Sequence, residues 1–531
     1  MPSGAGDTAR FAVSDVADVS VTAGTQIGAI IFTPGASSFT ITTDPGVFNI
    51  AGTGIENDSN AMQNFIANQP YMGLAFHHQA TAGTQTVFTV ENLSVIVFYD
   101  EATAGLGTFT IKGNTAFMDG ASAAYFYDGA SAGSGIFING GGTGFDAEGG
   151  GTVFRGQSTA ANAAFTNMAA TDTTSYPSVI VFQEHSTAAD SIITNQGGVV
   201  ASGVGGLTDF VDHATAAFAT ITCQGAQLAG AYGGIVAFSE TASAGSATLV
   251  ANGGINGGDG GTIRFFDTSD GGQVRVVLFG NGTLDLTDLA RPALTIGSLE
   301  GDGSVLLDIH NLTVGSNNVT TEFSGIVQDG GINGGMGGSL TKIGAGVFTL
   351  SGANLYTGGT TVTEGALGVS NTTGSGTGSG AVQVNTGTLG GSGIISGAVT
   401  IGTGSGTGAF LAPAHGTNVQ TTLSIQSPLS FNADSTYTCT FKARSNRAKT
   451  DKVIADGVTI NSGASFAFQG SAQGPLRLGL VLTVISNTSA NPIAGTFSNL
   501  PDGAILRVNG NNFQASYEGG DGNDLTLAVV P

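Results

Sequence analysis

Five acidic residues recur at regular intervals in the first half of the chain, and they are the residues best placed to do chemistry. Each stands two positions after a phenylalanine, and the set is Asp100, Asp128, Glu184, Asp212 and Glu240. If the chain repeats at this spacing, the carboxylates form a column with neighbours about 4.8 Å apart, where like charges repel. The column then consists either of turn residues that point to water or of an edge that holds calcium or a polycation. Gly156 and Thr268 interrupt it, which favours turns.

A second group of charged residues could act on a polysaccharide. Arg264 and Arg275 flank Asp267 and Asp270. Lyases use a basic side chain near carboxylates, whereas hydrolases use two carboxylates at a defined separation. The alternative is simple charge compensation between neighbouring strands, which we favour because the chain has no tryptophan to stack on a sugar. We therefore assign no catalytic residue, no cofactor and no metal ligand, and leave calcium open only for the carboxylate column.

These positions depend on an internal repeat. Phenylalanine recurs every 28 residues and is followed each time by a corner similar to Ala-Thr-Ala-Gly, and a further copy begins at Phe76, 22 residues before Phe98. A fixed period of this length is typical of a solenoid, in which each turn buries its apolar face against its neighbours. The phenylalanines then stack as a ladder. The predicted ladder residues are Phe98, Phe126, Phe154, Phe182, Phe210, Phe238 and Phe266.

Each repeat contains two short strand patterns and no helical one. Residues 95–98 and 179–182 are apolar runs that end on the ladder position, and residues 108–111 and 220–223 are second runs after the corner. β-Branched and aromatic residues alternate with small polar ones in these runs, which is typical of strands. The pattern predicts an all-β fold, a parallel β-helix with two or three faces per coil of 28 residues.

The charge of the chain argues against nucleic acid as a partner. The sequence has 14 Lys and Arg against 37 Asp and Glu, a net charge of −23. That balance opposes binding of the chain as a whole to nucleic acid, which needs a basic surface. No apolar run is long enough for a transmembrane helix, and the first residues lack the pattern of a signal peptide. The 88 glycines would suggest disorder without the repeat, but 40% hydrophobic residues in strand-like runs indicate a folded chain.

The two cysteines predict no redox or zinc chemistry. Cys223 and Cys439 lie far apart in the sequence, each inside a predicted strand, and no Cys-x-x-Cys pair is present. We expect both to be small buried apolar residues, without a disulfide between them.

Residues 340–367 carry three short motifs in a row: Thr-Lys-x-Gly-x-Gly, Leu-Ser-Gly-x-Asn and Tyr-Thr-Gly-Gly-Thr-Thr-Val. This segment resembles the passenger-associated β-strand repeat of bacterial autotransporters, and the phenylalanine repeat is similar to the upstream part of such proteins. The resemblance implies a right-handed parallel β-helix and a secreted or surface-displayed protein. It implies no activity, because passengers include adhesins, enzymes and toxins. The export signal and membrane anchor of the family are not recognisable, so we expect a trimmed chain or another route of anchoring.

Four segments are expected along the chain. They are residues 1–75 with N-terminal coils and a cap, 76–300 with the 28-residue repeats, 301–410 with the passenger-associated repeat, and 411–531 as a β-rich C-terminal capping region. The last segment resembles the passenger region that caps the helix and helps it fold from one end. It contains the basic cluster Lys442, Arg444, Arg447, Lys449 and Lys452.

The sequence predicts a non-enzymatic scaffold or adhesin whose partner is an extracellular surface, a glycan or another copy of the chain. Two near-identical glycine-rich loops, residues 253–261 and 330–338, are the predicted recognition features. Two alternatives remain: a polysaccharide lyase or hydrolase on the same fold, and a self-assembling extracellular fibre or coat. A cleft with two convergent carboxylates and an arginine would favour the enzyme. A face without such a cleft favours adhesion, and complementary ends or lateral patches favour assembly.

Overall fold

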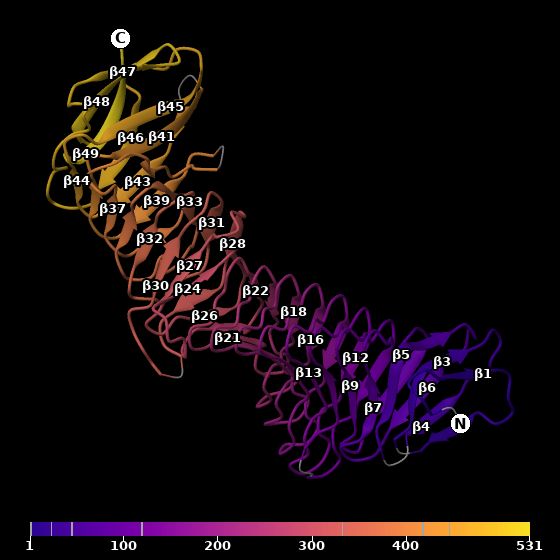
Figure 1. The fold of residues 1–531 in the computed structure, drawn as a ribbon. Coiled ribbons are helices and arrows are strands. Elements are labelled where there is room, and N and C mark those ends of the chain that lie inside the picture. Colours follow the sequence, from indigo (N-terminus) through magenta and orange to yellow (C-terminus); the bar gives the residue numbers. More distant parts are fainter. Residues whose placement is uncertain are drawn as a thin grey trace. The chain divides into compact units, whose positions relative to one another are not determined.

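The computed structural model describes residues 3–22, 24–43, 46–117, 120–331, 333–416, 419–444 and 447–531. These residues form β-strands and no helix (Figure 1). The chain divides into two compact units, residues 1–291 and 292–531, and in each unit strands from successive coils pair in parallel. The predicted all-β parallel β-helix is therefore confirmed. Met1 and Pro2 of the predicted N-terminal segment and Ile332 of the second glycine-rich loop lie outside the described residues.

The N-terminal unit has two long parallel sheets, here called sheet A and sheet B. Each coil contributes one strand to each sheet. The strands of sheet A are β1 (Thr8–Phe11), β3 (Gln26–Phe32), β5 (Phe48–Asn57), β7 (Gly73–Phe76), β9 (Val95–Phe98), β11 (Ala123–Phe126), β13 (Gly151–Phe154), β15 (Val179–Phe182), β17 (Leu207–Phe210), β19 (Ile235–Phe238), β21 (Thr262–Phe265) and β23 (Thr283–Asp285). Those of sheet B are β2 (Asp18–Val21), β4 (Thr40–Thr43), β6 (Gln63–Ala67), β8 (Thr86–Val90), β10 (Thr108–Ile111), β12 (Ile136–Asn139), β14 (Ala164–Asn167), β16 (Ile192–Asn195), β18 (Thr220–Cys223), β20 (Thr248–Ala251) and β22 (Arg275–Leu278).

Besides the two sheets, the Ala-Thr-Ala-Gly corners form a third row of pairings between successive coils. The corner hydroxyl residues of successive coils pair as isolated parallel bridges, from Thr81 to Ser243. Each hydroxyl accepts the backbone N–H two residues later at 3.0–3.1 Å, and the alanines on both sides are buried. The small residues let the chain turn sharply, and the hydroxyl satisfies an N–H that would otherwise be unpaired.

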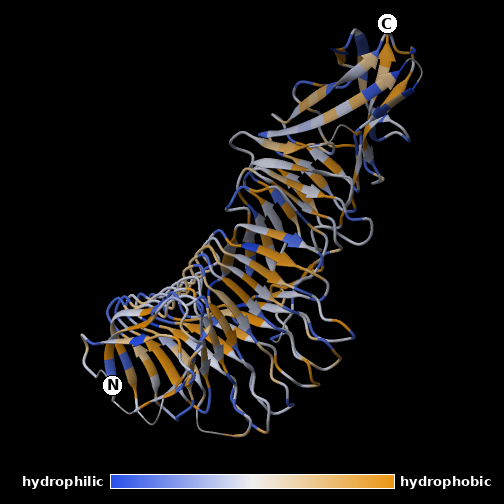
Figure 2. Ribbon diagram, turned by 90° about the vertical axis from the view of Figure 1, so that its right-hand side faces the viewer, coloured by the Kyte–Doolittle hydropathy of each residue, from blue (hydrophilic) through white to orange (hydrophobic). Residues whose placement is uncertain are grey.

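The phenylalanine ladder fills the bore along sheet A. Consecutive rings from Phe76 to Phe265 stack with centroids 4.7–5.0 Å apart and interplanar angles of 4–13°. The rings are essentially fully buried, so each coil removes one aromatic side chain from water. Hydrophobic residues recur at the same place in successive coils (Figure 2).

A second ladder, which we did not predict, lies on the inner face of sheet B. Its members are Phe65, Phe88, Phe109, Phe137 and Phe165, with centroids 4.5–4.9 Å apart. The two ladders meet edge to face, for example Phe126 and Phe137 at 5.8 Å and 71°. Aromatic rings favour this arrangement, because the positive edge of one faces the negative face of the other.

The predicted ladder residue Phe266 is wrong by one position. Phe265, not Phe266, pairs in register with Phe238 and stacks on it at 5.0 Å. The corner from Phe238 to β20 keeps its length, so the lost residue lies in the loop between β20 and β21, where glycines 253–261 make the turn. Phe266 falls outside the bore and is partly exposed.

A short ladder of buried asparagine side chains lies at the ends of β12, β14 and β16 in sheet B. Asn139 donates to Asn167 at 2.9 Å, and Asn167 donates to Asn195 at 2.7 Å. The next position is Cys223, which Asn195 reaches at 3.8 Å from Nδ2 to Sγ. Cys223 and Cys439 are both buried and free, and burial raises the pKa of each thiol to about 12. Both thiols are therefore held neutral and unreactive.

The C-terminal unit continues with narrower coils. One parallel sheet contains β24 (Ala293–Ile296), β27 (Asn311–Val314), β30 (Ser339–Lys342), β32 (Thr360–Val362), β34 (Val382–Val384), β37 (Val399–Ile401), β40 (Leu429–Phe431) and β44 (Val458–Ile460). A second contains β25 (Ser298–Gly301), β28 (Thr321–Phe323), β31 (Val347–Leu350), β33 (Ala366–Val369), β35 (Gly387–Gly391), β38 (Ala409–Leu411), β41 (Ser435–Arg444) and β45 (Ser465–Gln473). The short strands β26 (Ser304–Leu306) and β29 (Ile326–Gln328) pair with each other in parallel.

The far end of this unit changes from parallel to antiparallel pairing. Strands β36 (Ile394–Ile395), β39 (Thr422–Ile425), β43 (Lys452–Ala455) and β46 (Val481–Asn487) are parallel, whereas β49 (Asp524–Val530), β48 (Asn511–Gly519) and β47 (Ile505–Val508) follow in antiparallel order. The hairpin of β41 and β42 (Arg447–Thr450) is also antiparallel. The last three strands thus add to the sheet through the pairing of β49 with β46, and all their pairings are antiparallel.

Lys342 is a charged residue inside the C-terminal unit. It is 1% exposed, and its Nζ donates to the carbonyl oxygens of Ile343 at 2.6 Å and Gly344 at 2.7 Å. Burial lowers the pKa of Lys342 to about 8, and the nearby Glu364 opposes the shift. Desolvation therefore outweighs the carboxylate.

We expect alanine substitutions of Phe265 and Phe266 to differ in their effect on the free energy of unfolding. Phe265→Ala removes a ring from the ladder and should lower the free energy of unfolding by about 3–5 kcal/mol, because the cavity cannot be refilled. Phe266→Ala should cost less than about 1 kcal/mol. Urea unfolding of the two variants provides the comparison, and an equal or larger loss for Phe266→Ala would contradict the register.

Lys342 should make the C-terminal unit more stable at alkaline pH. Between pH 8 and the ordinary lysine pKa of 10.5, the unfolded chain holds a proton that the folded chain has released, so the free energy of unfolding rises with pH. Relative to Lys342→Met, the protein should gain roughly 2 kcal/mol between pH 8 and about 9.5. Urea unfolding at several pH values measures the gain, and a difference that does not change with pH would show that Lys342 titrates normally.

Candidate functional site

The predicted carboxylate column lies along the corner that follows sheet A. Its five residues have left-handed backbone conformations, with φ of 55–59°. All but the partly exposed Asp212 are exposed. Aspartate and asparagine tolerate this region better than most others because of their short polar side chains, but glutamate does not share that advantage, so Glu184 needs another source of stability.

That source is a hydrogen bond between coils. The Asp100 carboxylate accepts the backbone N–H of His78 at 2.8 Å, and the Glu184 carboxylate accepts that of Gly156 at 2.8 Å. Asp212 does the same for Glu184 at 2.8 Å. A carboxylate that accepts an N–H is partly compensated, so a file of like charges is tolerated. The column thus joins each corner to the preceding one.

The column does not end at Thr268, as the spacing predicted. Because the coil before it is one residue shorter, Asp267 occupies the corner, with a φ of 50° and a carboxylate that accepts the Glu240 N–H at 3.1 Å. Gly156 fills the one position without a carboxylate, at a φ of 69°. Among the described residues, no group of three or more His, Cys, Asp or Glu side chains is close enough to hold a metal ion. The calcium edge stays a prediction.

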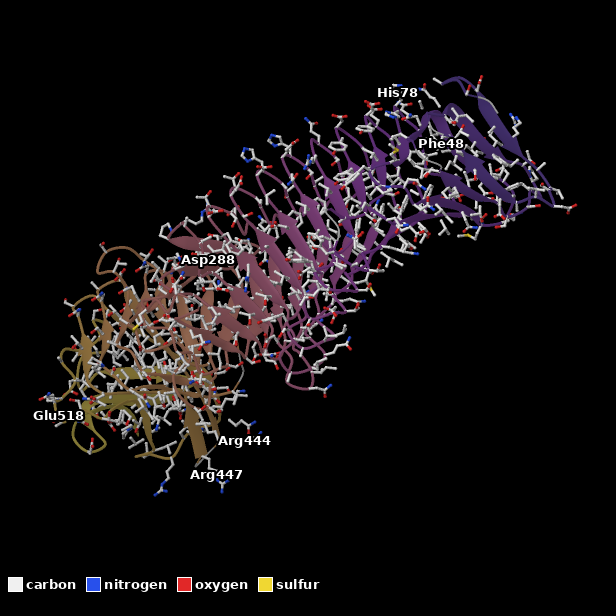
Figure 3. The ribbon with its side chains drawn as sticks, turned by 90° about the horizontal axis from the view of Figure 1, so that it is seen from below. Phe48, His78, Asp288, Arg444, Arg447 and Glu518 are labelled. Atoms are coloured by element: carbon white, nitrogen blue, oxygen red, sulfur yellow. The ribbon has the colours of Figure 1, made fainter. Side chains whose placement is uncertain are left out.

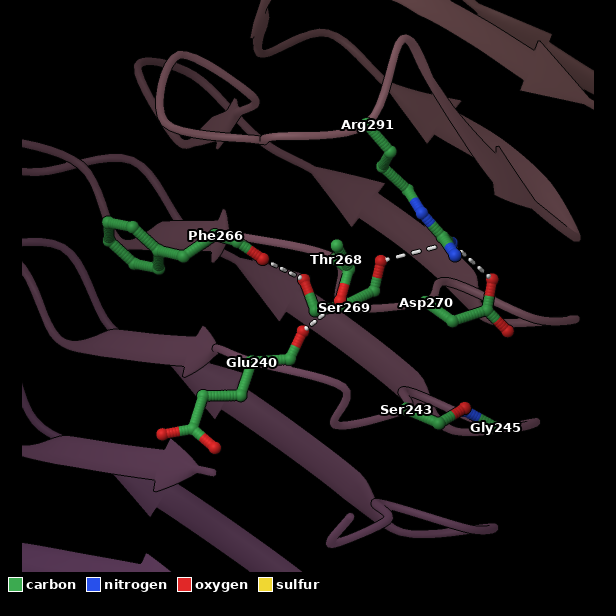
Figure 4. Close-up of polar contacts among 8 residues, drawn as sticks. All are labelled: Glu240, Ser243, Gly245, Phe266, Thr268, Ser269, Asp270 and Arg291. Carbon is green, nitrogen blue, oxygen red and sulfur yellow. Dashed lines mark hydrogen bonds and ion pairs between the residues drawn. The ribbon is translucent and has the colours of Figure 1, made fainter. Parts of the chain in front are cut away.

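The four charged residues predicted as an enzyme site do not converge. Arg264 of β21 in sheet A lies 3.9 Å from Asp285, whereas Arg275 lies on β22 in sheet B. Asp270 pairs with Arg291 at 3.3 Å, and Arg291 also donates to the carbonyl oxygen of Ser269 at 3.2 Å (Figure 4). Arg291, which the sequence did not single out, therefore covers the corner.

A different set of charged residues lines a hollow on the outer face of sheet A. The hollow is about 410 Å³ and is bordered by Asp209, Arg264, Phe266 and Asp267, with the small Ala237 among its lining residues. Burial raises the pKa of Asp209, which favours its protonated form. Two carboxylates and an arginine therefore border one hollow, although Asp209 was not among the predicted residues.

The outer face of sheet B has an opposite character and is here called the binding face. Its outward positions from β4 to β20 are threonine, isoleucine or valine, except Asn64 and Ala164, and none is charged. In-register pairing places them on a grid about 4.8 Å across the strands and about 6.8 Å along them. Ile136 and Ile192 are 49% and 59% exposed. β-Branched side chains are stiff at χ1, so this face is ordered before any partner arrives.

The two predicted glycine-rich recognition loops belong to different units. Residues 253–261 connect β20 to β21 in the N-terminal unit, and residues 330–338 connect β29 to β30 in the C-terminal unit. In residues 253–261, Ile255 is 59% exposed, and the Asn256 side chain donates to the carbonyl oxygen of Gln227 at 3.0 Å. In the described part of 330–338, Met336 is 73% exposed and Gly335 N–H donates to buried Asp308 at 2.5 Å. The described part of each loop thus exposes an apolar side chain, Ile255 or Met336, and is tied to a neighbouring coil. Their role in recognition stays a prediction.

Comparison with known proteins adds one family. Residues 340–369 match the passenger-associated-transport-repeat, which spans β30 to β33 and includes the buried Lys342. No curated protein matches the chain. Within the described residues, no helix has the length and apolar character needed to cross a membrane. Together with the coils of parallel strands, the match at residues 340–369 supports an autotransporter passenger repeat protein.

Proposed function

We propose that this protein is a secreted or surface-displayed scaffold that adheres, without catalysis, to an extracellular surface or glycan through the binding face of sheet B. The passenger-associated repeat supports export. The observation that carries adhesion is that the outward positions of sheet B, from β4 to β20, hold no charged side chain in a chain with a net charge of −23. A partner can cover this face without the cost of burying an ion.

The geometry of the face suits an extended partner. Threonine hydroxyls supply donors and acceptors, and the methyl groups of isoleucine, valine and threonine supply apolar contact. Because the same side chains recur at each coil, many weak contacts add over a long surface. A glycan, which has hydroxyl edges and apolar ring faces, presents the matching chemistry.

A substitution on the binding face tests this function. Ile138→Glu and Thr166→Glu place a charge at its centre and should weaken binding to a glycan array or to cell surfaces by about tenfold or more, because the charge must be buried. Val153→Glu, at an outward position of sheet A, is the matched control and should bind normally. Absence of binding by the unmodified protein, or an equal loss in the control, would contradict adhesion. Filaments that Thr166→Glu abolishes would indicate self-assembly instead.

The hollow on sheet A supports a second candidate, a polysaccharide-active enzyme. Asp209, whose pKa is raised by burial, could serve as the acid and Asp267 as the second carboxylate, while Phe266 offers a ring for sugar contact. The carboxylate of Asp267 already accepts the Glu240 N–H and is engaged in the corner, which favours adhesion over this candidate.

A depolymerisation screen on acidic and neutral glycans decides the second candidate. If the hollow is catalytic, Asp209→Asn should abolish release of reducing ends, because it removes the carboxyl group that would act as the acid. Asp190→Asn, at an exposed corner, should leave the rate unchanged. If the unmodified protein releases no product, hydrolytic and eliminative cleavage of the glycans tested are both excluded.

A further inference from the structure

The most basic segment of the chain forms the hairpin of β41 and β42 in the C-terminal unit. Five of the chain's 14 Lys and Arg residues fall within residues 442–452, although the net charge of the chain is −23. In the hairpin, Lys442 stands directly opposite Lys449 and Arg444 directly opposite Arg447. Like charges in directly opposed positions destabilise a pair of antiparallel strands.

Nothing in the described part of the chain neutralises the arginines of this hairpin. No carboxylate of the described residues lies within ion-pair distance of Arg444, Arg447 or Lys449, whose side chains are exposed. The nearest acidic residue in sequence, Asp451, is buried and accepts the backbone N–H groups of Thr421 and Thr440 at 3.1 and 2.7 Å. Arg444, Arg447 and Lys449 therefore face solvent without a carboxylate partner among the described residues.

A third strand extends the cluster into an array. Strand β45 pairs with β41 so that Ser471 lies beside Lys442, and Gln473 beside Arg444. Two parallel rows result, Lys449–Lys442–Ser471 and Arg447–Arg444–Gln473, and they line a hollow of about 610 Å³ whose only other lining residues are two alanines. Arg444 and Arg447 project from the body of the unit (Figure 3).

We propose that this array, here called the cationic array, is a binding site for an acidic polysaccharide. Its arginines can bind carboxylate or sulfate groups in bidentate fashion, and a bound anion relieves the repulsion across both strand pairs. Ser471 and Gln473 continue each row with a neutral hydroxyl and amide, which match the hydroxyl groups between the charges of such a polymer.

Two other anionic partners fit the array less well. A membrane surface would favour aromatic or large apolar side chains beside the cations, and the lining of the hollow has none. A second copy of this chain would have to offer its carboxylate column, but most of those side chains already accept backbone N–H groups. The proposal does not depend on the binding face of sheet B.

Binding of the purified chain to immobilised polygalacturonate and heparin tests the site, with neutral dextran as the blank. Both acidic polymers should bind, with an affinity that falls as salt is raised, whereas dextran should not. The double variant Arg444→Gln, Arg447→Gln should weaken binding by about tenfold or more, and Arg444→Lys, Arg447→Lys should restore only part of it, because lysine keeps the charge but loses the fork.

A charge-matched control separates the array from net charge. Arg10→Gln with Arg477→Gln removes two exposed cations elsewhere, and this variant should bind as the unmodified protein does. Thermal melting establishes that all variants are folded. The proposal is overturned if neither polymer binds at low salt, if the control loses affinity equally, or if only vesicles with anionic lipid bind. Self-association that the arginine variant abolishes, without polymer binding, would assign the array to a second copy.

Discussion

In-register parallel pairing of successive coils is the constraint on which the N-terminal unit depends. Once one coil lies on the next in register, every residue type is placed next to its own kind, at about the interstrand distance. That is favourable for phenylalanine, which stacks, for asparagine, which donates from one amide to the next, and for threonine at the corners. It is unfavourable for charge. A residue type can therefore recur at one position of successive coils only if it tolerates an identical neighbour.

The carboxylate column shows how the same constraint accommodates charge. Its residues lie where the backbone is left-handed, and the carboxylates of Asp100, Glu184 and Asp212 each accept an N–H from another coil. The interaction needs a corner, because strand N–H groups are already used in the sheets. Sheet B from β4 to β20 consequently carries no outward charge, whereas the corners do. The uncharged face and the charged corner follow from one backbone.

The sequence predicted the coil, the strands and most of the ladder, because identical residues at a fixed spacing reveal stacking. It could not decide between Phe265 and Phe266, since two adjacent phenylalanines satisfy the pattern and the lost residue lies among glycines that carry no register. The same slip placed Thr268 where Asp267 belongs. The second ladder was missed although Phe109, Phe137 and Phe165 have the same spacing. Asp209 and Arg291 could not be predicted, because their positions depend on which coils meet around Ala237 and Asp270.

The C-terminal unit departs from the rule of like beside like, and its departures are where charge gathers. Lys342 is alone in its row and is satisfied by carbonyl oxygens of its own turn, so it needs no matching neighbour. In the hairpin of β41 and β42 the pairing is antiparallel, so lysine lies opposite lysine and arginine opposite arginine without any repeat of the sequence between coils. Nothing in that local pairing required lysine opposite lysine or arginine opposite arginine, since a single acidic residue on either strand would have relieved the repulsion. Four cations on one surface of an otherwise acidic chain are therefore the feature that a bound anion would stabilise.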